Sequence, residues 1–202
     1  MRHESEELLE LWFGEPTLPL EELAARVPLW FASDAEFDRE ISERFWSLPE
    51  RALTGELDDW ATEPRSALAL VLALDQLPRN LYRGQARAFE FDARACEVAE
   101  RAIDAGFDQR LSPVHTAFFY VPFEHAEDLG LQDRGVALFE QLVARAPEAL
   151  VAACTNFASY ARRHRDVVRR FGRFPHRNVL LGRSSTRAEI DYLESGGERF
   201  GG

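Results

Sequence analysis

The chain has 202 residues, of which 46% are hydrophobic and 29% charged, and its formal net charge is −11. This composition is typical of a globular protein and not of a disordered chain, and the length predicts one domain over residues 1–202. A polyanion would be repelled by so acidic a chain, so we expect no nucleic-acid partner. The N-terminus is acidic, unlike an export signal, and the longest wholly apolar run, residues 67–74, is too short to cross a bilayer. We therefore expect a cytoplasmic protein without a membrane partner.

Two cysteines, Cys96 and Cys154, are too few for a disulfide framework or a four-ligand zinc site. We expect both to be reduced, partly buried helix residues. The sequence contains no glycine-rich phosphate loop, no nucleophile elbow and no H-E-x-x-H motif. It therefore predicts neither a cofactor nor a metal centre.

Helical periodicity extends over almost the whole chain, and no segment shows the sustained alternation of a strand. We predict an all-α protein with no sheet, in which successive antiparallel helix pairs are joined by short breaks at glycine and proline. The first helix is expected to have Ser5 as its N-cap and to close at Gly14. The next is expected to begin near Asp34 and to be interrupted by Pro49.

The middle of the chain predicts three more helices. The run RSALALVLALDQLPRN, which follows Pro64, is apolar nearly all round, so it should be a central helix packed on several sides. Pro78 should end or kink this helix. Further helices are predicted over about 86–105 and from 112 to the proline at 122.

The last third of the chain predicts an amphipathic helix over 136–147 and a long helix over about 148–171 that ends at Gly172. A final helix should begin with a capping box, in which Thr186 and Glu189 satisfy each other's free backbone donors.

Three polar clusters coincide with the predicted helix ends or breaks: LDQLPRNLYRG at 74–84, VPFEHAEDLG at 121–130 and FGRFPHRNVLLGRSST at 171–186. The third overlaps a basic stretch, 160–187, that contains nine arginines and one aspartate, a net charge of +8 in an acidic chain. The planar guanidinium group suits bidentate contacts with carboxylate or phosphate. The clustering therefore indicates either an anion site or a set of internal ion pairs.

Each cluster also has a purely structural interpretation. In the first, Arg79 can pair with Asp75 one helical turn earlier, while the functional alternative is that Arg79 and Arg83 face an anion. In the second, His125 lies one turn from Asp128, but no further histidine or cysteine pair at ligand spacing accompanies it, so no metal is predicted. In the third, the arginines can neutralise acids of the second cluster, because buried acids require partners.

His164 lies at the centre of the apolar face of the predicted long helix. A lone histidine in this position is typically a hydrogen-bonded core residue. Nearby arginines would favour its neutral form, which is also the form that a general base requires.

The blocks LALVLALDQLPRNLYRGQARAFEFDARA, FFYVPFEHAEDLGLQ and RFGRFPHRNVLLGRSST resemble the signature blocks of an uncharacterised, mainly bacterial family, domain-of-unknown-function family 924. The resemblance implies an all-helical, tetratricopeptide-like right-handed superhelix and implies no established activity. The family pattern falls on the residues of the three clusters: Asp75, Gln76, Arg79, Asn80, Arg83, Glu124, His125, Glu127, Arg173, His176, Arg177, Asn178 and Arg183.

Our leading hypothesis is that the three clusters meet in one groove that binds a small anionic ligand or the acidic end of a peptide. Two alternatives stay open at this point: a hydrolase-type enzyme with His125 or His176 as acid or base, and a peptide-binding scaffold whose polar clusters are purely structural. The predicted ligand-binding residues are Asp75, Arg79, Asn80, Arg83, Glu124, His125, Glu127, Arg173, His176, Arg177, Asn178 and Arg183.

Overall fold

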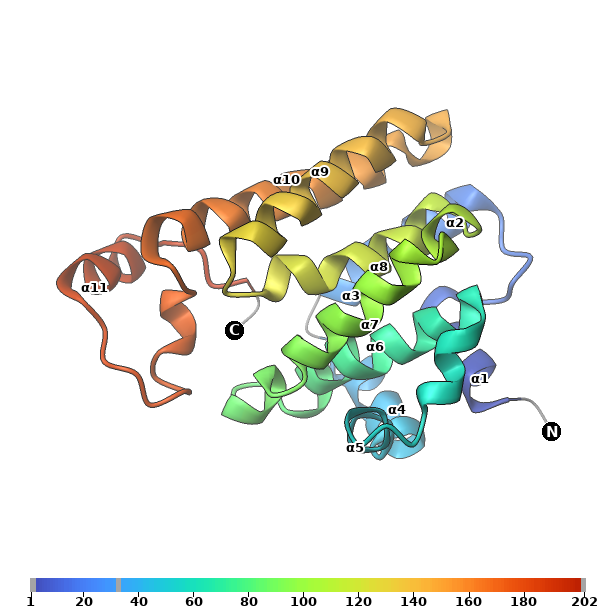
Figure 1. The fold of residues 1–202 in the computed structure, drawn as a ribbon, viewed down its shortest axis with the longest axis horizontal. Coiled ribbons are helices and arrows are strands. Elements are labelled where there is room, and N and C mark those ends of the chain that lie inside the picture. Colours follow the sequence, from blue (N-terminus) through green and yellow to red (C-terminus); the bar gives the residue numbers. More distant parts are fainter. Residues whose placement is uncertain (1–2, 32–33, 201–202) are drawn as a thin grey trace.

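The computed structural model describes residues 3–31 and 34–200, and within these ranges the chain is helical and contains no strand (Figure 1). This confirms the all-α prediction. The α-helices are α1 (Glu4–Phe13), α2 (Leu20–Ala25), α3 (Val27–Phe31), α4 (Ala35–Phe45), α5 (Leu48–Leu53), α6 (Pro64–Leu81), α7 (Asp92–Asp104), α8 (Pro113–His125), α9 (Leu129–Arg145), α10 (Glu148–Phe171) and α11 (Arg187–Glu194). Short 3₁₀ turns are η1 (Asp58–Thr62), η2 (Ala86–Phe89), η3 (Phe107–Gln109) and η4 (Pro175–Arg177).

Helix α6 is the central element, as its apolar sequence predicts. It contacts α1, α4, α5, α7 and α8, and its side chains are continuously buried from Ala67 to Pro78. Burial on all sides removes a large apolar area from water, which is the main favourable contribution to folding. The helix therefore fixes the position of the polar residues at its C-terminal end.

Two prolines lie inside helices instead of ending them. Helix α8 continues past Pro122 to His125, so the predicted end at Pro122 is wrong. Helix α6 continues past Pro78 to Leu81, so of the two effects predicted for Pro78, an end or a kink, the end is wrong. An internal proline removes one backbone hydrogen bond, but tertiary packing on both sides of these buried helices outweighs that local cost. As a result, polar residues that follow each proline are held on a rigid helical turn.

Other boundaries also differ from the sequence prediction. The N-cap of α1 is His3 and not Ser5, because the imidazole accepts a hydrogen bond from the backbone N–H of Ser5. Asp34 does cap α4, but α4 ends before Pro49, which lies instead in the first turn of α5, where proline is tolerated. The single helix predicted over 86–105 is divided into η2 and α7.

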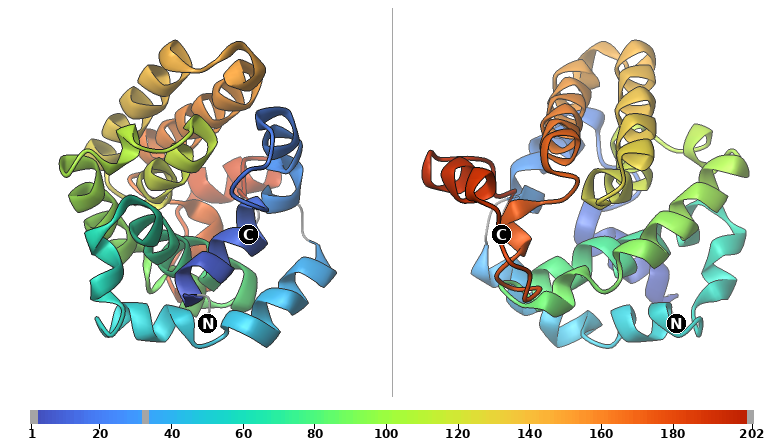
Figure 2. Two further views of the ribbon diagram at one scale, coloured as in Figure 1. Left: turned by 90° about the vertical axis from the view of Figure 1, so that its right-hand side faces the viewer. Right: turned by 60° about the vertical axis from the view of Figure 1, so that its left-hand side comes forward.

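Helices α9 and α10 form an antiparallel pair, and the predicted bounds of α10, including its end at a left-handed Gly172, are confirmed. The pair lies side by side in all the ribbon views and packs on α8 (Figures 1 and 2). After Gly172 the chain passes through η4 and a loop into α11, which lies at the left-hand end of the molecule in Figure 1. The predicted capping box of Thr186 and Glu189 is present at the start of α11.

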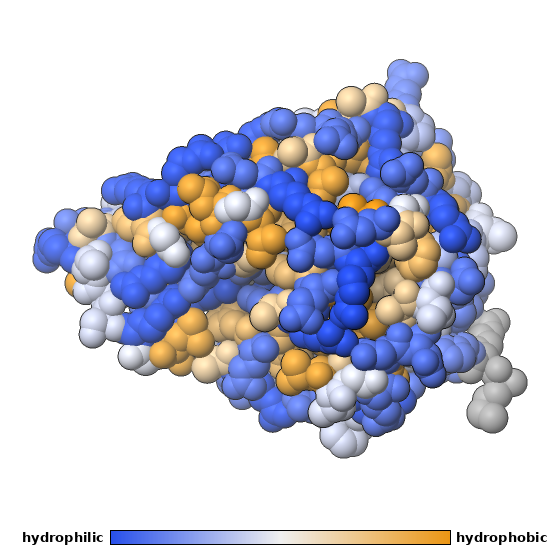
Figure 3. All heavy atoms as spheres, in the orientation of Figure 1, coloured by the Kyte–Doolittle hydropathy of each residue, from blue (hydrophilic) through white to orange (hydrophobic). Residues whose placement is uncertain are grey.

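The buried apolar side chains form one large core and a small second cluster, in which Val167 and Val168 of α10 pack with Phe174. Cys96 and Cys154 are both buried and free, which places them deeper than the partly buried position predicted. The face in Figure 3 shows hydrophilic residues interspersed with smaller apolar areas. In the part of the chain that the structure describes, no helix is long and apolar enough to cross a membrane.

The close packing of α9 on α8 depends on Gly135, since a Cβ at this position would lie 2.9 Å from Cβ of Phe123. We expect Gly135→Ala to lower the free energy of unfolding by about 1–3 kcal/mol, because overpacking outweighs the gain in helix propensity. Denaturant unfolding would measure the change, with Gln141→Ala on an exposed position of α9 as the control. Unchanged or increased stability of Gly135→Ala would contradict this packing argument.

Candidate functional site

A cavity of about 340 Å³ lies where the three polar clusters meet. Its walls come from the C-terminal ends of α6 and α8, the middle of α10, the segment around η4 and the residues that follow α11. The lining residues are Trp30, Gln76, Arg79, Asn80, Arg83, Gly84, Ala88, Phe89, Val121, Glu124, His125, Asn156, Phe157, Tyr160, Arg163, His164, His176, Arg177, Leu180, Glu198 and Phe200.

The structure separates the predicted ligand-binding residues into two groups. One group lines the cavity: Arg79, Asn80, Arg83, Glu124, His125, His176 and Arg177. The other group lies outside the lining and makes contacts with other protein groups: Asp75, Glu127, Arg173, Asn178 and Arg183.

Asp75 and His125 form a buried hydrogen-bonded pair at the cavity wall. The Nδ1 atom of His125 lies 2.7 Å from Oδ1 of Asp75, while Oδ2 of Asp75 accepts a hydrogen bond from the side chain of Gln76 at 2.6 Å. Burial by itself would raise the pKa of Asp75, but the interactions with His125 and Arg79 hold that pKa below its usual value. Burial, followed by the charge of Arg79, lowers the pKa of His125. At neutral pH the pair is therefore an aspartate and a neutral imidazole whose Nδ1–H donates to it.

Asp92, the first residue of α7, joins the first polar cluster to the third. Its Oδ1 accepts from Arg79 at 2.8 Å, and its Oδ2 accepts from Arg177 at 3.1 Å. Sequence reasoning did not single out Asp92, although it lies within the first of the three family-like blocks and begins a helix. Its partner Arg177 is 85 residues away in the sequence, so no local pattern could reveal the contact.

Arg177 is 6% exposed and lies between two aromatic rings. Its guanidinium carbon is 4.4 Å from the ring centre of Phe89 and 4.5 Å from that of Phe174. Burial lowers its pKa to about 10, so it stays positively charged at neutral pH. Among the described residues its Nε atom has no hydrogen-bond partner. An unpartnered buried donor of this kind is uncommon in folded proteins.

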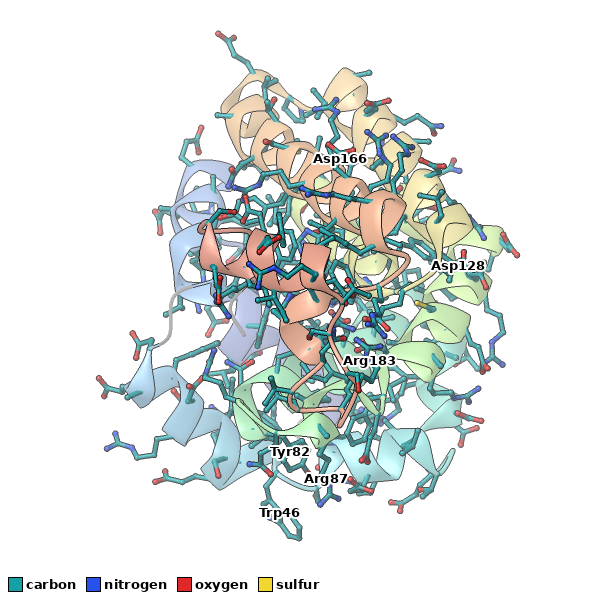
Figure 4. All side chains as sticks on the ribbon, turned by 90° about the vertical axis from the view of Figure 1, so that its left-hand side faces the viewer. Trp46, Tyr82, Arg87, Asp128, Asp166 and Arg183 are labelled. Carbon is teal, nitrogen blue, oxygen red and sulfur yellow. The ribbon has the colours of Figure 1, made fainter. Side chains whose placement is uncertain are left out.

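A supporting network behind the cavity holds the segment that follows α10. Glu127 accepts hydrogen bonds from both terminal nitrogens of Arg183 and, at 2.7 Å, from the backbone N–H of Phe174. Arg183 also donates through Nε to Asn178 at 3.0 Å. The ion pair between the third and second clusters that the sequence suggested is therefore present. In Figure 4, Arg183 lies between the α8–α9 connection, marked by Asp128, and the α6–α7 connection, marked by Tyr82 and Arg87.

Arg173 has a separate structural partner. It forms a bidentate contact with Glu189, at 2.7 Å and 2.9 Å, and so connects the end of α10 to the capping box of α11. This contact stabilises the deprotonated carboxylate and, together with the hydrogen bonds of Thr186, outweighs the opposing effect of burial and lowers the pKa of Glu189 to about 2.

Glu124 and His164 form the most buried polar part of the cavity. Glu124 is 5% exposed, its Oε2 lies 3.5 Å from Nδ1 of His164, and its Oε1 has no hydrogen-bond partner among the described residues. Burial, followed by the charge of Asp75, raises the pKa of Glu124 well above its usual value. A protonated carboxyl group is a hydrogen-bond donor, and Glu124 is one of the residues that line the cavity.

His164 is buried and its Nδ1 donates to the carbonyl oxygen of Tyr160 at 2.8 Å, as expected for a hydrogen-bonded core histidine. Burial, followed by His125, lowers its pKa, which favours the neutral form of the ring. Its ring stacks on Phe200 with 3.6 Å between the ring centres. His176 also lines the cavity, and burial followed by Arg177 lowers its pKa to about 4.

Several wall residues were not found from the sequence. Many of these unpredicted wall residues are aromatic: Trp30, Phe89, Phe157 and Phe200. Single aromatic residues at helical spacing predict core packing, so nothing in their local pattern distinguishes a cavity wall from an ordinary core.

The fold and the cavity together define an all-helical protein with a partly open cavity lined by polar and aromatic residues. The chain belongs to the family described as "Bacterial protein of unknown function (DUF924)", which matches residues 8–197. A solved structure of a protein of unknown function from Agrobacterium tumefaciens, ATU0120, is similar, with a TM-score of 0.81 and 38% sequence identity over 95% of this chain and 97% of that chain. No curated protein matches the chain.

The protonation of Glu124 can be tested through the pH dependence of stability. A raised pKa in the folded state means that the stabilisation is complete below the unfolded-state pKa and is lost as the pH rises toward the folded-state value. Because glutamine does not titrate, the stability of Glu124→Gln should increase relative to the wild type by about 1.4 kcal/mol per pH unit over this range. Urea unfolding at pH 5, 6 and 7 would measure the difference. If the unfolding free energies of the wild type and Glu124→Gln changed with pH in the same way, Glu124 would be ionised in the folded protein and the prediction would be wrong.

Proposed function

We propose that the cavity binds a small molecule with one carboxylate or phosphate group and an apolar portion. The observation that carries this proposal is the enclosure of guanidinium groups and aromatic rings in one space of about 340 Å³. Pockets for small molecules usually have volumes of roughly 300–1,000 Å³ and combine apolar walls with a few convergent polar groups.

The arginines support an anionic group on the ligand. Arg177 has a buried Nε without a partner among the described residues, and Arg83 uses its Nη2 for Asp38 while its side chain is 38% exposed. Charge-assisted hydrogen bonds to a carboxylate or phosphate are stronger than those between neutral groups. Asp92 and Asp38 already balance much of the positive charge. The site therefore suits a ligand with one anionic group better than a polyanion.

The aromatic residues support an apolar portion of the ligand. Trp30, Phe89, Phe157 and Phe200 belong to the same wall as the polar groups, and each offers ring surface to a bound molecule. Glu198 and Phe200 contact α10 through Arg163 and His164. Because these contacts partly enclose the cavity, a small molecule fits better than an extended peptide, which would need an open groove.

The hydrolase-type alternative is favoured by one specific observation, the Asp75–His125 hydrogen bond, which orients an imidazole beside the cavity. His176 has no comparable carboxylate partner on its ring: its Nδ1 is buried and unpartnered among the described residues. Of the two histidines proposed from the sequence, His125 is therefore the better candidate for acid–base chemistry.

We also propose a specific arrangement of the helices. The antiparallel neighbours α8, α9 and α10 support a tetratricopeptide-like right-handed superhelix within a single domain over residues 1–202. A cytoplasmic location and the lack of a nucleic-acid partner remain expectations from the composition.

Arg83→Gln should weaken the binding of benzoate and phenyl phosphate by about tenfold to a hundredfold, because a charge-assisted hydrogen bond contributes roughly 1.5–3 kcal/mol. Isothermal titration calorimetry would measure the affinities, with benzamide as the uncharged ligand.

Arg87→Gln provides the matched control, since Arg87 is a nearby arginine that pairs with Glu50 and does not line the cavity. Its affinities should equal those of the wild type. The proposal fails if the wild type binds neither anion, or if the two arginine variants weaken binding equally.

A further inference from the structure

We propose that this cavity is catalytic: His125 removes a proton from the carbon next to the carbonyl group of a 2-oxo acid, while the carboxyl group of Glu124 donates a hydrogen bond to the carbonyl oxygen. The inference rests on the proposed function, because the substrate's carboxylate is held by the cavity arginines. It adds a reaction, proton transfer at carbon, and a substrate class.

His125 has the geometry of an oriented base. Its Nδ1–H donates to Asp75 at 2.7 Å, so the lone pair of the neutral ring is on Nε2, and the side chain lines the cavity. Asp75 is 1% exposed and is itself fixed by Gln76 and Arg79. This arrangement fixes both the tautomer and the direction of the imidazole, as a buried carboxylate does for a catalytic histidine. Asp75 is a positioning residue, because it acts through His125.

Glu124 supplies the second group that such a reaction needs. Its Oε1 is buried in the cavity wall and has no partner among the described residues. The one N–H of neutral His164 is directed to the carbonyl oxygen of Tyr160 at 2.8 Å, which leaves the carboxyl group of Glu124 to bind a ligand. A buried polar group without a partner costs about 1–3 kcal/mol, and a substrate carbonyl oxygen would remove that cost.

The remaining lining argues for proton transfer over covalent catalysis. The lining of the described cavity contains no serine, threonine or cysteine, and the sequence contains no lysine. Acyl-enzyme and Schiff-base mechanisms therefore lack their usual nucleophiles at this site. A neutral histidine, a carboxylic acid and arginines are instead the groups that enolisation of a small carboxylate-bearing ketone requires.

The step is balanced without a further reactant. Nε2 of His125 takes one proton from carbon 3, the electron pair of that C–H bond forms the bond between carbons 3 and 2, and the carbonyl electrons move to oxygen. That oxygen takes the proton of Glu124, so the product is the enol, with His125 protonated and Glu124 ionised. Reversal returns a proton to carbon 3. If the proton on His125 has exchanged with solvent, carbon 3 receives a solvent hydrogen.

Phenylpyruvate in D₂O tests the proposal, because it carries a carboxylate, a ketone and an aromatic ring. NMR would follow the exchange of its carbon-3 hydrogens, and calorimetry would measure its binding to the same protein. We expect the wild type to accelerate exchange at least about a hundredfold over buffer, and His125→Gln to lose roughly 10²–10⁴ of the rate, the usual contribution of a general base. His115→Gln is the control, since His115 lies on the same helix outside the cavity lining and should leave the rate unchanged.

Three further variants separate chemistry from folding. Glu124→Gln keeps a hydrogen-bond donor and should retain more activity than Glu124→Ala. Asp75→Asn should lower the maximal exchange rate and shift the part of its pH dependence that reports the ionisation of the base, His125, without a matching change in KM. A merely structural role would give equal losses for both Glu124 variants. If the wild type binds phenylpyruvate and exchange stays at the buffer rate, the catalytic inference is overturned and the proposed binding function stands. If the wild type binds neither phenylpyruvate nor benzoate, both are overturned.

Discussion

The shared carboxylate of Asp92 holds the candidate site together. It bridges Arg79 of α6 and Arg177 of the segment after α10, and Arg79 in turn contacts Asp75, the partner of His125. These are buried or half-buried charges, and removing Asp92 would leave the buried Arg177 without its ion-pair partner. The same series of contacts thus closes the fold and orients the imidazole at the cavity wall. Structural and functional interpretations of the arginine clusters are therefore not exclusive at this site.

The division of the basic stretch follows from where its side chains find partners. Arg173 and Arg183 meet Glu189 and Glu127, and both pairs tie together the chain after α10. Arg177 instead reaches back to α7 and faces the cavity. The concentration of positive charge seen in the sequence thus serves mostly to neutralise acids brought from other parts of the chain. A smaller part of it lines the cavity.

Features set by neighbouring residues were predictable from the sequence. The capping box of α11, the bounds of α10 and the buried state of His164 each follow from spacing within one helix. The ends of α6 and α8 were wrong because packing from other helices overrides the local effect of Pro78 and Pro122. Each of the three clusters contributes residues to the cavity, yet the sequence could not show which members line it. That distinction, like the role of Asp92, depends on contacts between residues far apart in the chain.

The protein contains no lysine, and its arginines stay positively charged at every physiological pH. On acidification the charge of the cavity therefore changes only through its histidines and carboxyl groups. His125, His164 and His176 are kept neutral by burial and by nearby cationic groups. An anion placed among them favours their protonated forms. Under the proposed binding function, anion binding and proton uptake at this cavity are therefore thermodynamically linked, and each strengthens the other by the same factor.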